Sequence, residues 1–252
     1  MNTSQYVIPF IEAKLSTNKG SQVLEIGCGE GGVLKAFLDK DFIGTGVEIS
    51  ENMFNLAKVF LKQEIENQTV TLIKKDIYDV NLEKIFTSKF DLIVLKDVIE
   101  HIHDQGKLMA ILKKFLKPNG YIYIAFPPWQ MPFGGHQQTC RSKILSRTPF
   151  FHLLPNFVYK GVLKLFGEND NIIKGLMEAK ETGISIEKFE SIIHKAAYEI
   201  VTKELYLINP IYEYKFKLRP RKQLSFVAKV PYLRNYLTTC GYYLITPRKK
   251  WY

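Results

Sequence analysis

The sequence predicts an α/β fold built on a doubly wound sheet of seven mostly parallel strands, with an antiparallel edge strand and an inserted helical cap. Short apolar runs alternate with helical patterns from residue 20 to residue 127. This alternation is typical of a parallel sheet whose crossover helices cover both faces. A glycine-rich turn follows the first apolar run, and turns at this place lie at the carboxyl end of the sheet, where doubly wound folds bind ligands.

The strands of this sheet are expected at 22–26, 42–49, 69–77, 90–102 and 121–128. Helical spacing between them predicts helices at 33–40, 51–60, 81–86 and 106–116, after a short amphipathic helix at 6–15. Ser50 stands directly before the second of these crossover helices, and a serine there can cap the free N–H groups of the first turn.

We expect one domain over residues 1–252, with the ligand-binding core at 20–127. Residues 129–195 contain prolines and helical patches without a complete hydrophobic pattern of their own, which favours a helical elaboration on the substrate side over a separate domain. Residues 198–252 return to strand-like sequence at 198–208 and 241–247 and carry a basic tail. These two runs predict the antiparallel strands.

The composition, with 46% hydrophobic and 24% charged residues, is typical of a globular protein and excludes disordered, collagen-like and coiled-coil chains. A net charge of +10 favours nucleic acid, an anionic membrane surface or an acidic substrate without choosing among them. Cys28, Cys140 and Cys240 lack the spacing of a disulfide framework or zinc site. Without a signal sequence or a long apolar run, we expect a cytoplasmic protein, and peripheral contact with the inner membrane surface stays open.

The stretch from Gly27 to Gly32 is the most specific feature of the sequence. Its glycines allow a sharp turn and let a ligand approach the backbone, while the next helix offers free N–H groups to an anion. A plain strand-to-helix turn remains the alternative. Gly27, Gly29 and Gly32 also satisfy the dinucleotide spacing G-x-G-x-x-G, so the glycines alone leave an NAD-dependent oxidoreductase open.

Glu25 lies two residues before the first glycine, and the arrangement E-x-G-x-G-x-G from Glu25 to Gly31 resembles motif I of class I S-adenosylmethionine-dependent methyltransferases, which have a Rossmann-like fold. The resemblance implies S-adenosyl-L-methionine as the cofactor, with Glu25 facing its methionine end. The cofactor-binding residues of this turn would be Glu25, Gly27, Cys28, Gly29 and Gly31.

Later segments resemble the same superfamily in the same order over residues 20–127. Glu48 and Ile49 end the second strand, where a carboxylate can accept both ribose hydroxyls. Asp76 and Ile77 close the third, where the resemblance implies a contact with the adenine amino group and ring. Residues 95–104 resemble the "VLEH" segment of small-molecule methyltransferases, and this resemblance adds Lys96 to the cofactor-binding positions. Residues 116–121 resemble the "LKPGG" turn, with Asn119 in place of the first glycine.

Methyl transfer requires alignment of the acceptor and exclusion of water, and it needs a base only if the acceptor carries a proton. His101 and His136 are the candidate catalytic bases, with a structural or cofactor-adjacent role as the alternative for each. His136 could also contact the substrate, as could Trp129 and Phe133, although the two aromatic residues could equally pack a lid. The remaining histidines lack metal-ligand spacing, so no metal is expected.

The acceptor is expected to be a small molecule, lipophilic or glycosylated, methylated at oxygen or carbon. The segment 140–166 mixes basic and apolar residues and could line a substrate pocket, lie on an anionic bilayer or form a homodimer contact. An RNA or protein substrate is an alternative, although no base-flipping tetrad or RNA-binding signature is present and nucleic acid is not the first choice. A non-catalytic partner subunit that binds S-adenosylmethionine is a further alternative.

Overall fold

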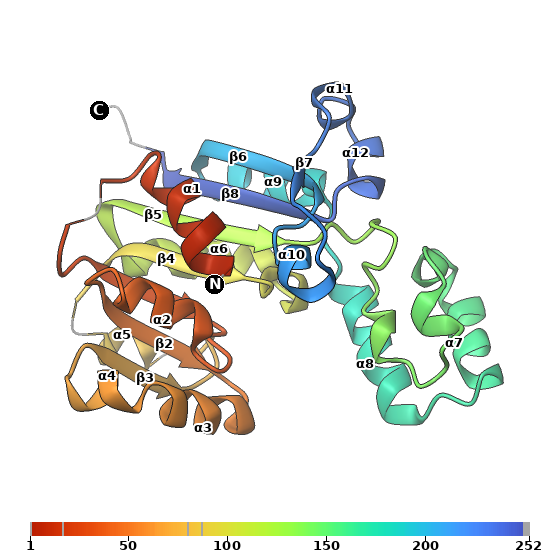
Figure 1. The fold of residues 1–252 in the computed structure, drawn as a ribbon, viewed down its shortest axis with the longest axis horizontal. Helices are drawn as coiled ribbons and strands as arrows, with labels where there is room; N and C mark the ends of the chain where they lie inside the picture. The colour runs from red at the N-terminus through yellow and green to blue at the C-terminus, as the bar shows by residue number, and fades with distance from the viewer. Residues whose placement is uncertain (1, 17, 80, 87, 249–252) are drawn as a thin grey trace.

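A computed structural model describes residues 2–16, 18–79, 81–86 and 88–248 (Figure 1). In this part of the chain one sheet has eight strands in the order β3-β2-β1-β4-β5-β8-β6-β7. Its parallel half consists of β1 (Gln22–Ile26), β2 (Ile43–Glu48), β3 (Val70–Lys74), β4 (Phe90–Lys96) and β5 (Leu116–Phe126). The predicted α/β class with a mostly parallel sheet is confirmed.

The strand β8 (Cys240–Pro247) lies between β5 and β6 (Tyr198–Ile208) and is antiparallel to both. It therefore runs inside the sheet, and the edge is formed by the two-residue strand β7 (Arg221–Lys222), which is the eighth strand. The central strand β4 shows why the parallel half forms. Its residues 92–95 are all fully buried, as expected for a strand that helices cover on both faces.

Two layers of helices cover this sheet (Figure 1). On one face, a π-helical turn (Thr3–Val7), α1 (Ile8–Glu12) and α2 (Gly32–Leu38) contribute Ile11, Leu34 and Phe37 to a buried cluster with strand residues such as Leu92. On the opposite face, α6 (Gln105–Phe115) and α9 (Ile186–Lys195) enclose a second cluster. The helices α4 (Lys62–Glu66) and α5 (Leu82–Ile85) are short connections.

The helix α3 (Glu51–Phe60) begins as predicted, because the Ser50 hydroxyl accepts a hydrogen bond from the Met53 N–H. Of its apolar side chains, however, only that of Ala57 is buried. Leu56 and Phe60 are exposed, because α3 lies at the β2–β3 end of the sheet (Figure 1), where its contacts with other described elements are mainly those with β2, β3 and α4.

The segment after β5 forms the cap. It contains three 3₁₀ turns (Gln137–Thr139, Leu145–Arg147 and Phe151–Leu153) and the helices α7 (Asn156–Leu165) and α8 (Asp170–Thr182). Apolar side chains of these pieces form a third cluster, separate from the two beside the sheet: Cys140, Leu145, Phe151, Tyr159, Leu163, Ile173 and Leu176. The cap thus has a small core of its own, which the sequence pattern did not reveal, while α9 belongs to the sheet layer.

Three short helices complete the chain between the last strands: α10 (Ile211–Phe216), α11 (Ser225–Ala228) and α12 (Leu233–Tyr236). None of them was expected. The last residues of the basic tail, 249–252, lie outside the described residues. Over the described part of the chain, no helix combines the length and the apolar character needed to cross a bilayer.

Candidate functional site

The glycine turn between β1 and α2 has the conformation that its sequence predicts. Gly27, Gly29 and Gly31 all have positive φ angles, of 65°, 52° and 86°, which side chains with a Cβ rarely adopt. A Cβ at Gly27 would lie 2.8 Å from Val98 Cγ2, whereas a Cβ at Gly29 would meet no atom within 4 Å. The turn is therefore closed toward the protein at Gly27 and open at Gly29.

The carboxylate of Glu48 ties the end of β2 to this turn. One oxygen accepts a hydrogen bond from the Gly29 N–H at 2.8 Å, and the other accepts one from the Ser50 N–H at 2.7 Å. Glu48 is buried but lines a cavity. A carboxylate can accept about four hydrogen bonds, so Glu48 is held in place by two backbone groups and keeps capacity for a ligand.

This first cavity has a volume of about 580 Å³ and falls in the usual range of small-molecule sites. It runs along the carboxyl ends of the first, second, third and fourth strands and is lined by Ile26, Gly27, Val47, Glu48, Ile49, Lys75, Asp76, Ile77, Tyr78, Asp97, Val98, His101, Ile102 and His103. Asp76 accepts a hydrogen bond from the Tyr78 N–H with one oxygen, which turns the chain at the cavity wall. Polar acceptors and apolar walls thus alternate along the cavity.

Two further predicted residues, Glu25 and Lys96, lie behind this cavity and do not line it. Glu25 is 3% exposed and one of its carboxylate oxygens, Oε2, has no hydrogen-bond partner among the described residues. Burial raises the pKa of Glu25 well above its usual value, and Lys96 opposes this rise. The Lys96 ammonium forms an ion pair with Asp97 at 2.5 Å.

The end of β4 departs from ordinary backbone geometry at Asp97, whose φ of 58° is left-handed. Non-glycine residues in this conformation tend to cluster at functional sites. Three residues later Glu100 is 5% exposed, and neither of its carboxylate oxygens has a hydrogen-bond partner among the described residues. Burial and the neighbouring Asp97 raise the pKa of Glu100 well above the usual value. Glu100 is therefore neutral at a pH where surface carboxyl groups are charged.

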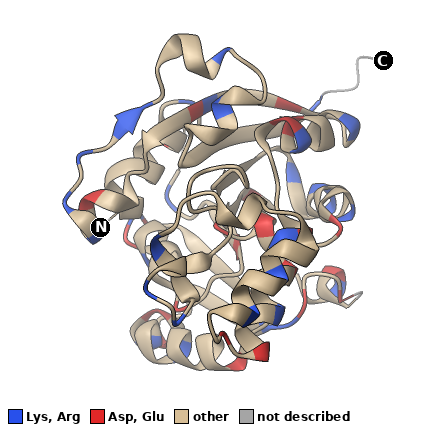
Figure 2. Cartoon of the chain, turned by 90° about the vertical axis from the view of Figure 1, so that its right-hand side faces the viewer, with Lys and Arg blue, Asp and Glu red and all other residues tan. Residues whose placement is uncertain are grey.

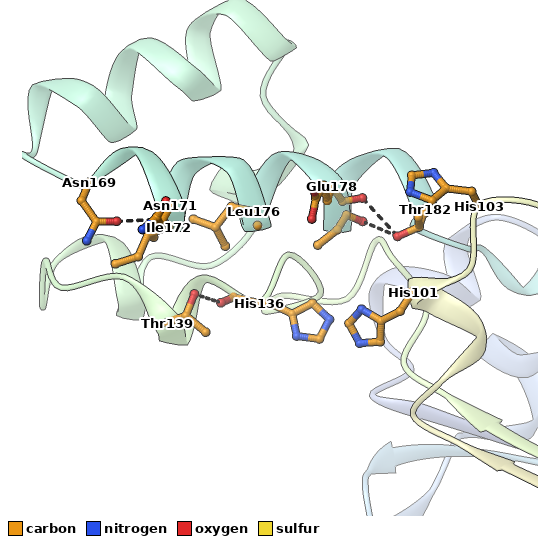
Figure 3. Close-up of a pocket in the computed structure, with 12 residues that line it drawn as sticks. His101, His103, His136, Thr139, Asn169, Asn171, Ile172, Leu176, Glu178 and Thr182 are labelled. Carbon is orange, nitrogen blue, oxygen red and sulfur yellow. Dashed lines mark hydrogen bonds between the residues drawn. The ribbon is translucent and has the colours of Figure 1, made fainter. Parts of the chain in front are cut away.

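His101 and His136 come together although 34 residues separate them in the chain. Their ring centroids are 4.9 Å apart, and Figure 3 shows the two rings facing each other beneath α8. Partial burial lowers the pKa of both histidines, and the proximity of His101 lowers that of His136 further. Both imidazoles are therefore neutral near pH 7. His136 also has a left-handed φ, of 54°.

A second cavity, also of about 580 Å³, opens between this pair and α8 (Figure 3). It is lined by His101, His103, His136, Thr139, Asn169, Asn171, Ile172, Gly175, Leu176, Glu178, Ala179 and Thr182. His101 and His103 line both cavities. The two cavities therefore meet at these histidines, so that a ligand along the strand ends and another ligand under α8 would face each other there.

A comparison with protein families gives a match to the methyltransferase domain over residues 4–141, which is more than half of the 252 residues. The chain belongs to this methyltransferase family. The matched region contains β1 to β5 and extends through His136 into the start of the cap.

Among curated proteins, this chain is similar to the ubiquinone biosynthesis O-methyltransferase of Coxiella burnetii, with 28% identity over 118 residues. This alignment covers 47% of the chain and 48% of that protein. The chain thus spans about half the length of the curated relatives it matches.

Solved structures resemble this chain over almost its whole length. A putative sarcosine dimethylglycine methyltransferase from Galdieria sulphuraria has a TM-score of 0.61 at 13% identity, covering 96% of this chain and 84% of that one. An S-adenosylmethionine-dependent methyltransferase from Clostridium acetobutylicum has a TM-score of 0.58 at 13% identity, covering 98% and 92%. At such low identity these likenesses establish a shared fold that includes the cap.

Several predicted site residues lie away from both cavities. The Cys28 side chain packs toward Gly46, and burial raises its pKa to about 12, so only its backbone is available to a ligand. The Trp129 ring packs edge-on against His152 with centroids 4.7 Å apart, and Phe133 is exposed. Neither aromatic residue lines the cavities, so their expected contact with the substrate stays a prediction.

Sequence reasoning missed a group of cavity residues. His103 was not among the predicted site residues, but it lines both cavities, and Tyr78 and Asp97 line the first. The α8 residues of the second cavity gave no signal, because Asn169, Glu178 and Thr182 belong to no motif. Only the proximity of His103 to His101 in the sequence offered any hint. Within the described residues, no three His, Cys, Asp or Glu side chains are grouped as metal ligands would be.

Proposed function

We propose that the chain is an S-adenosylmethionine-dependent methyltransferase that transfers a methyl group to a hydroxyl group of a small-molecule acceptor. The junction of the two cavities at His101 is the single observation that carries this proposal, because it brings a cofactor-sized space and an acceptor-sized space to one pair of neutral imidazoles. The name of the Coxiella burnetii relative, an O-methyltransferase, supports oxygen over carbon as the acceptor atom.

The residues of the first cavity fit S-adenosylmethionine. Glu48 is oriented by two backbone N–H groups and has acceptor capacity left for the ribose hydroxyls. Asp76 and Ile77 line the cavity at the next strand end, as an adenine contact requires. Gly29 leaves open space beside Glu48. The unpartnered, buried Glu25 oxygen behind the turn supports a role near the methionine end.

The second cavity favours an acceptor with both polar and apolar parts. Thr139, Asn171 and Glu178 offer hydrogen bonds, while Ile172 and Leu176 offer an apolar wall. The α8 helix and the cap loop face each other across this cavity (Figure 3). An acceptor held between them would be aligned with the cofactor, and alignment of the reactants can supply about 7 kcal/mol or more of the barrier.

Bound S-adenosylmethionine supplies a methyl group activated by a positively charged sulfur. The proposed contribution of the protein is the removal of the acceptor proton by a ring nitrogen of His136, which is unprotonated because burial and His101 lower its pKa. His101 lies between the cavities and would position His136 and the methyl group. Contact of the cap with a bilayer and a homodimer both stay predictions.

The deciding experiment combines binding and turnover. S-adenosylmethionine, but not NAD, should raise the melting temperature of the purified chain. Radiolabelled methyl from S-adenosylmethionine should then appear in a low-molecular-weight fraction of a cell extract separated by polarity, and His136→Gln should abolish this labelling while the thermal shift persists.

Each alternative gives a different outcome. A shift with NAD would favour an oxidoreductase, and label in the RNA or protein fraction would assign a macromolecular acceptor. A thermal shift with S-adenosylmethionine but no label in any fraction would favour a non-catalytic partner subunit. Any of these results would contradict the proposal.

A further inference from the structure

The segment 211–237, between β6 and β8, exposes an unusual amount of apolar surface. Tyr232 is 72% exposed, Phe226 69% and Phe216 61%. The other large apolar side chains exposed in this segment are Leu218, Leu224, Val230, Leu233, Tyr236 and Leu237. We call these nine exposed side chains, together with the exposed basic residues of the same segment, the apolar basic strip. Apolar groups gathered in this way usually mark an interaction surface.

Positive charge is interleaved with these apolar groups. The exposed basic residues of the strip are Lys215, Lys217, Arg219, Arg221, Lys222 and Lys229. Only Lys222 forms an ion pair with a carboxylate of the described chain, that of Glu204. Glu213 is the only acidic residue of the segment, and it accepts a hydrogen bond from the Tyr6 hydroxyl. The strip therefore has a positive charge that the described chain leaves largely unneutralised.

The strip is folded, because polar side chains anchor its inner surface. Arg234 is 8% exposed and forms ion pairs at 2.9 Å with both Glu187 and Glu190 of α9. Asn235 is also buried and accepts a hydrogen bond from the Ile186 N–H at 2.8 Å. These contacts hold α12 against the sheet layer. The apolar side chains are consequently presented outward on a fixed scaffold.

The strip lies at the same end of the molecule as the cavities. Figure 1 shows α10, α11 and α12 at the end toward which β5 points, above the cap helices α7 and α8. Figure 2 looks onto this end and shows the basic strand β7 as a blue arrow at its upper left margin. Tyr236 of the strip contacts Phe150 of the cap, with ring centroids 6.2 Å apart.

We propose that the apolar basic strip binds the surface of an anionic lipid bilayer. Aromatic and aliphatic side chains enter the boundary between headgroups and acyl chains, while Lys and Arg contact the anionic headgroups. The contact with Phe150 would then hold the cap, and with it the second cavity, beside the membrane surface. This proposal concerns a surface outside both cavities, and it does not depend on methyl transfer.

The composition of the strip favours a bilayer over the other occupants. An RNA surface would be matched by the cations but not by aliphatic residues such as Leu218, Leu224 and Leu233, which have no stacking face for bases. A second copy of this chain would bring a second unneutralised positive strip against the first, which like-charge repulsion opposes. Anionic lipids match both the apolar and the basic side chains.

The test measures sedimentation of the full chain with vesicles of phosphatidylcholine containing about 40% phosphatidylglycerol, and with vesicles of phosphatidylcholine alone. We expect binding to the anionic vesicles that weakens between about 0.1 M and about 0.5 M salt. The double variant Arg219→Glu/Arg221→Glu should lower the partition coefficient about thirtyfold. The double variant Phe226→Ser/Tyr232→Ser should also lower the partition coefficient. It should reduce, in addition, the binding that remains at high salt.

Matched controls lie on α3 and at the start of α4, which are distant from the strip in Figure 1 and also expose apolar and basic residues. The variants Lys58→Glu/Lys62→Glu and Val59→Ser/Phe60→Ser change the same residue classes there and should retain binding. Far-UV circular dichroism and melting temperature establish that each variant is folded.

Three outcomes would overturn the proposal. The first is the absence of binding to anionic vesicles, or an equal loss of binding in the control variants. The second is retention of the chain by mixed RNA with no affinity for vesicles. The third is a dimer, detected by sedimentation velocity, that the double variant Phe226→Ser/Tyr232→Ser dissociates. In this outcome neither the unmodified chain nor the variant binds vesicles.

Discussion

The rings of His101 and His136 lie 4.9 Å apart between centroids, at the point where the cavity along the strand ends meets the cavity under α8. One histidine follows β4 and the other lies in the cap loop after β5. Their proximity is therefore a product of the parallel sheet, which brings the ends of neighbouring strands together. Burial lowers the pKa of both histidines, and the proximity of His101 lowers that of His136 further.

The histidine pair predicts a pH dependence of the reaction. Burial lowers the pKa of His136 below the ordinary histidine value of about 6.5, and His101 lowers it further. His136 is therefore unprotonated, and able to act as the base, at any pH above this lowered pKa. We expect kcat/KM to rise with pH, to level off below pH 7, and to lose this rising limb in His136→Gln. The measurement is a pH profile of methyl transfer with the acceptor found in the extract assay. If the rising limb survives in His136→Gln but disappears in His101→Gln, the base is His101 and not His136.

Glu48 is expected to serve both stability and cofactor binding. The Glu48 carboxylate accepts hydrogen bonds from the Gly29 and Ser50 N–H groups. In Glu48→Gln the side-chain amide nitrogen would face one of these N–H groups, so we expect a loss of about 1–3 kcal/mol in the free energy of unfolding. The thermal shift by S-adenosylmethionine should disappear. The matched control is Glu51→Gln, an exposed residue paired with Lys74, for which the shift should persist. If S-adenosylmethionine raises the melting temperature of Glu48→Gln as it does that of the unmodified chain, Glu48 does not bind the cofactor.

Gly175 provides a way to close the second cavity. A Cβ there would meet no atom within 4 Å, and Gly175 lines the cavity, so a leucine side chain would fill space that the acceptor needs. We expect Gly175→Leu to raise the KM for the acceptor at least tenfold while S-adenosylmethionine binding is unchanged. Gly161→Leu on α7, also without neighbours, is the control and should leave both parameters unchanged. Equal KM values in the two variants would place the acceptor elsewhere.

Glu100 predicts a pH dependence of stability. Burial raises its folded-state pKa well above the usual 4.5, so the native state binds more protons than the unfolded state once the pH exceeds 4.5. Stability should therefore fall as pH rises from 4.5 toward the folded-state pKa. Glu100→Gln should flatten this fall and raise the melting temperature at pH 8 by about 2–4 °C, the shift that corresponds to ~1 kcal/mol in a chain of this size. Glu83→Gln, which alters an exposed ion pair with Lys114, is the control. Parallel melting curves for Glu100→Gln and the unmodified chain would refute this assignment.

Tertiary packing decided several features that the periodicity of the sequence could not. The apolar spacing of α3 is that of an amphipathic helix, yet only Ala57 is buried, because burial depends on whether another element covers the helix. The three helices in 211–237 are four to six residues long. Helices this short are stabilised by contacts such as those of Arg234 with α9 and have little periodic pattern of their own.

The sequence by itself determined which segments form the parallel strands and which residues lie at their carboxyl ends. Gly27, Glu48 and Asp76 could be placed on one cavity because a strand's end is a local property, and parallel strands end on the same side. Only the tertiary structure decided what lies opposite them. Three features depend on contacts between residues distant in the chain: the proximity of His101 to His136, the cavity wall formed by α8, and the outward surface of 211–237. No local pattern encodes which of these contacts form.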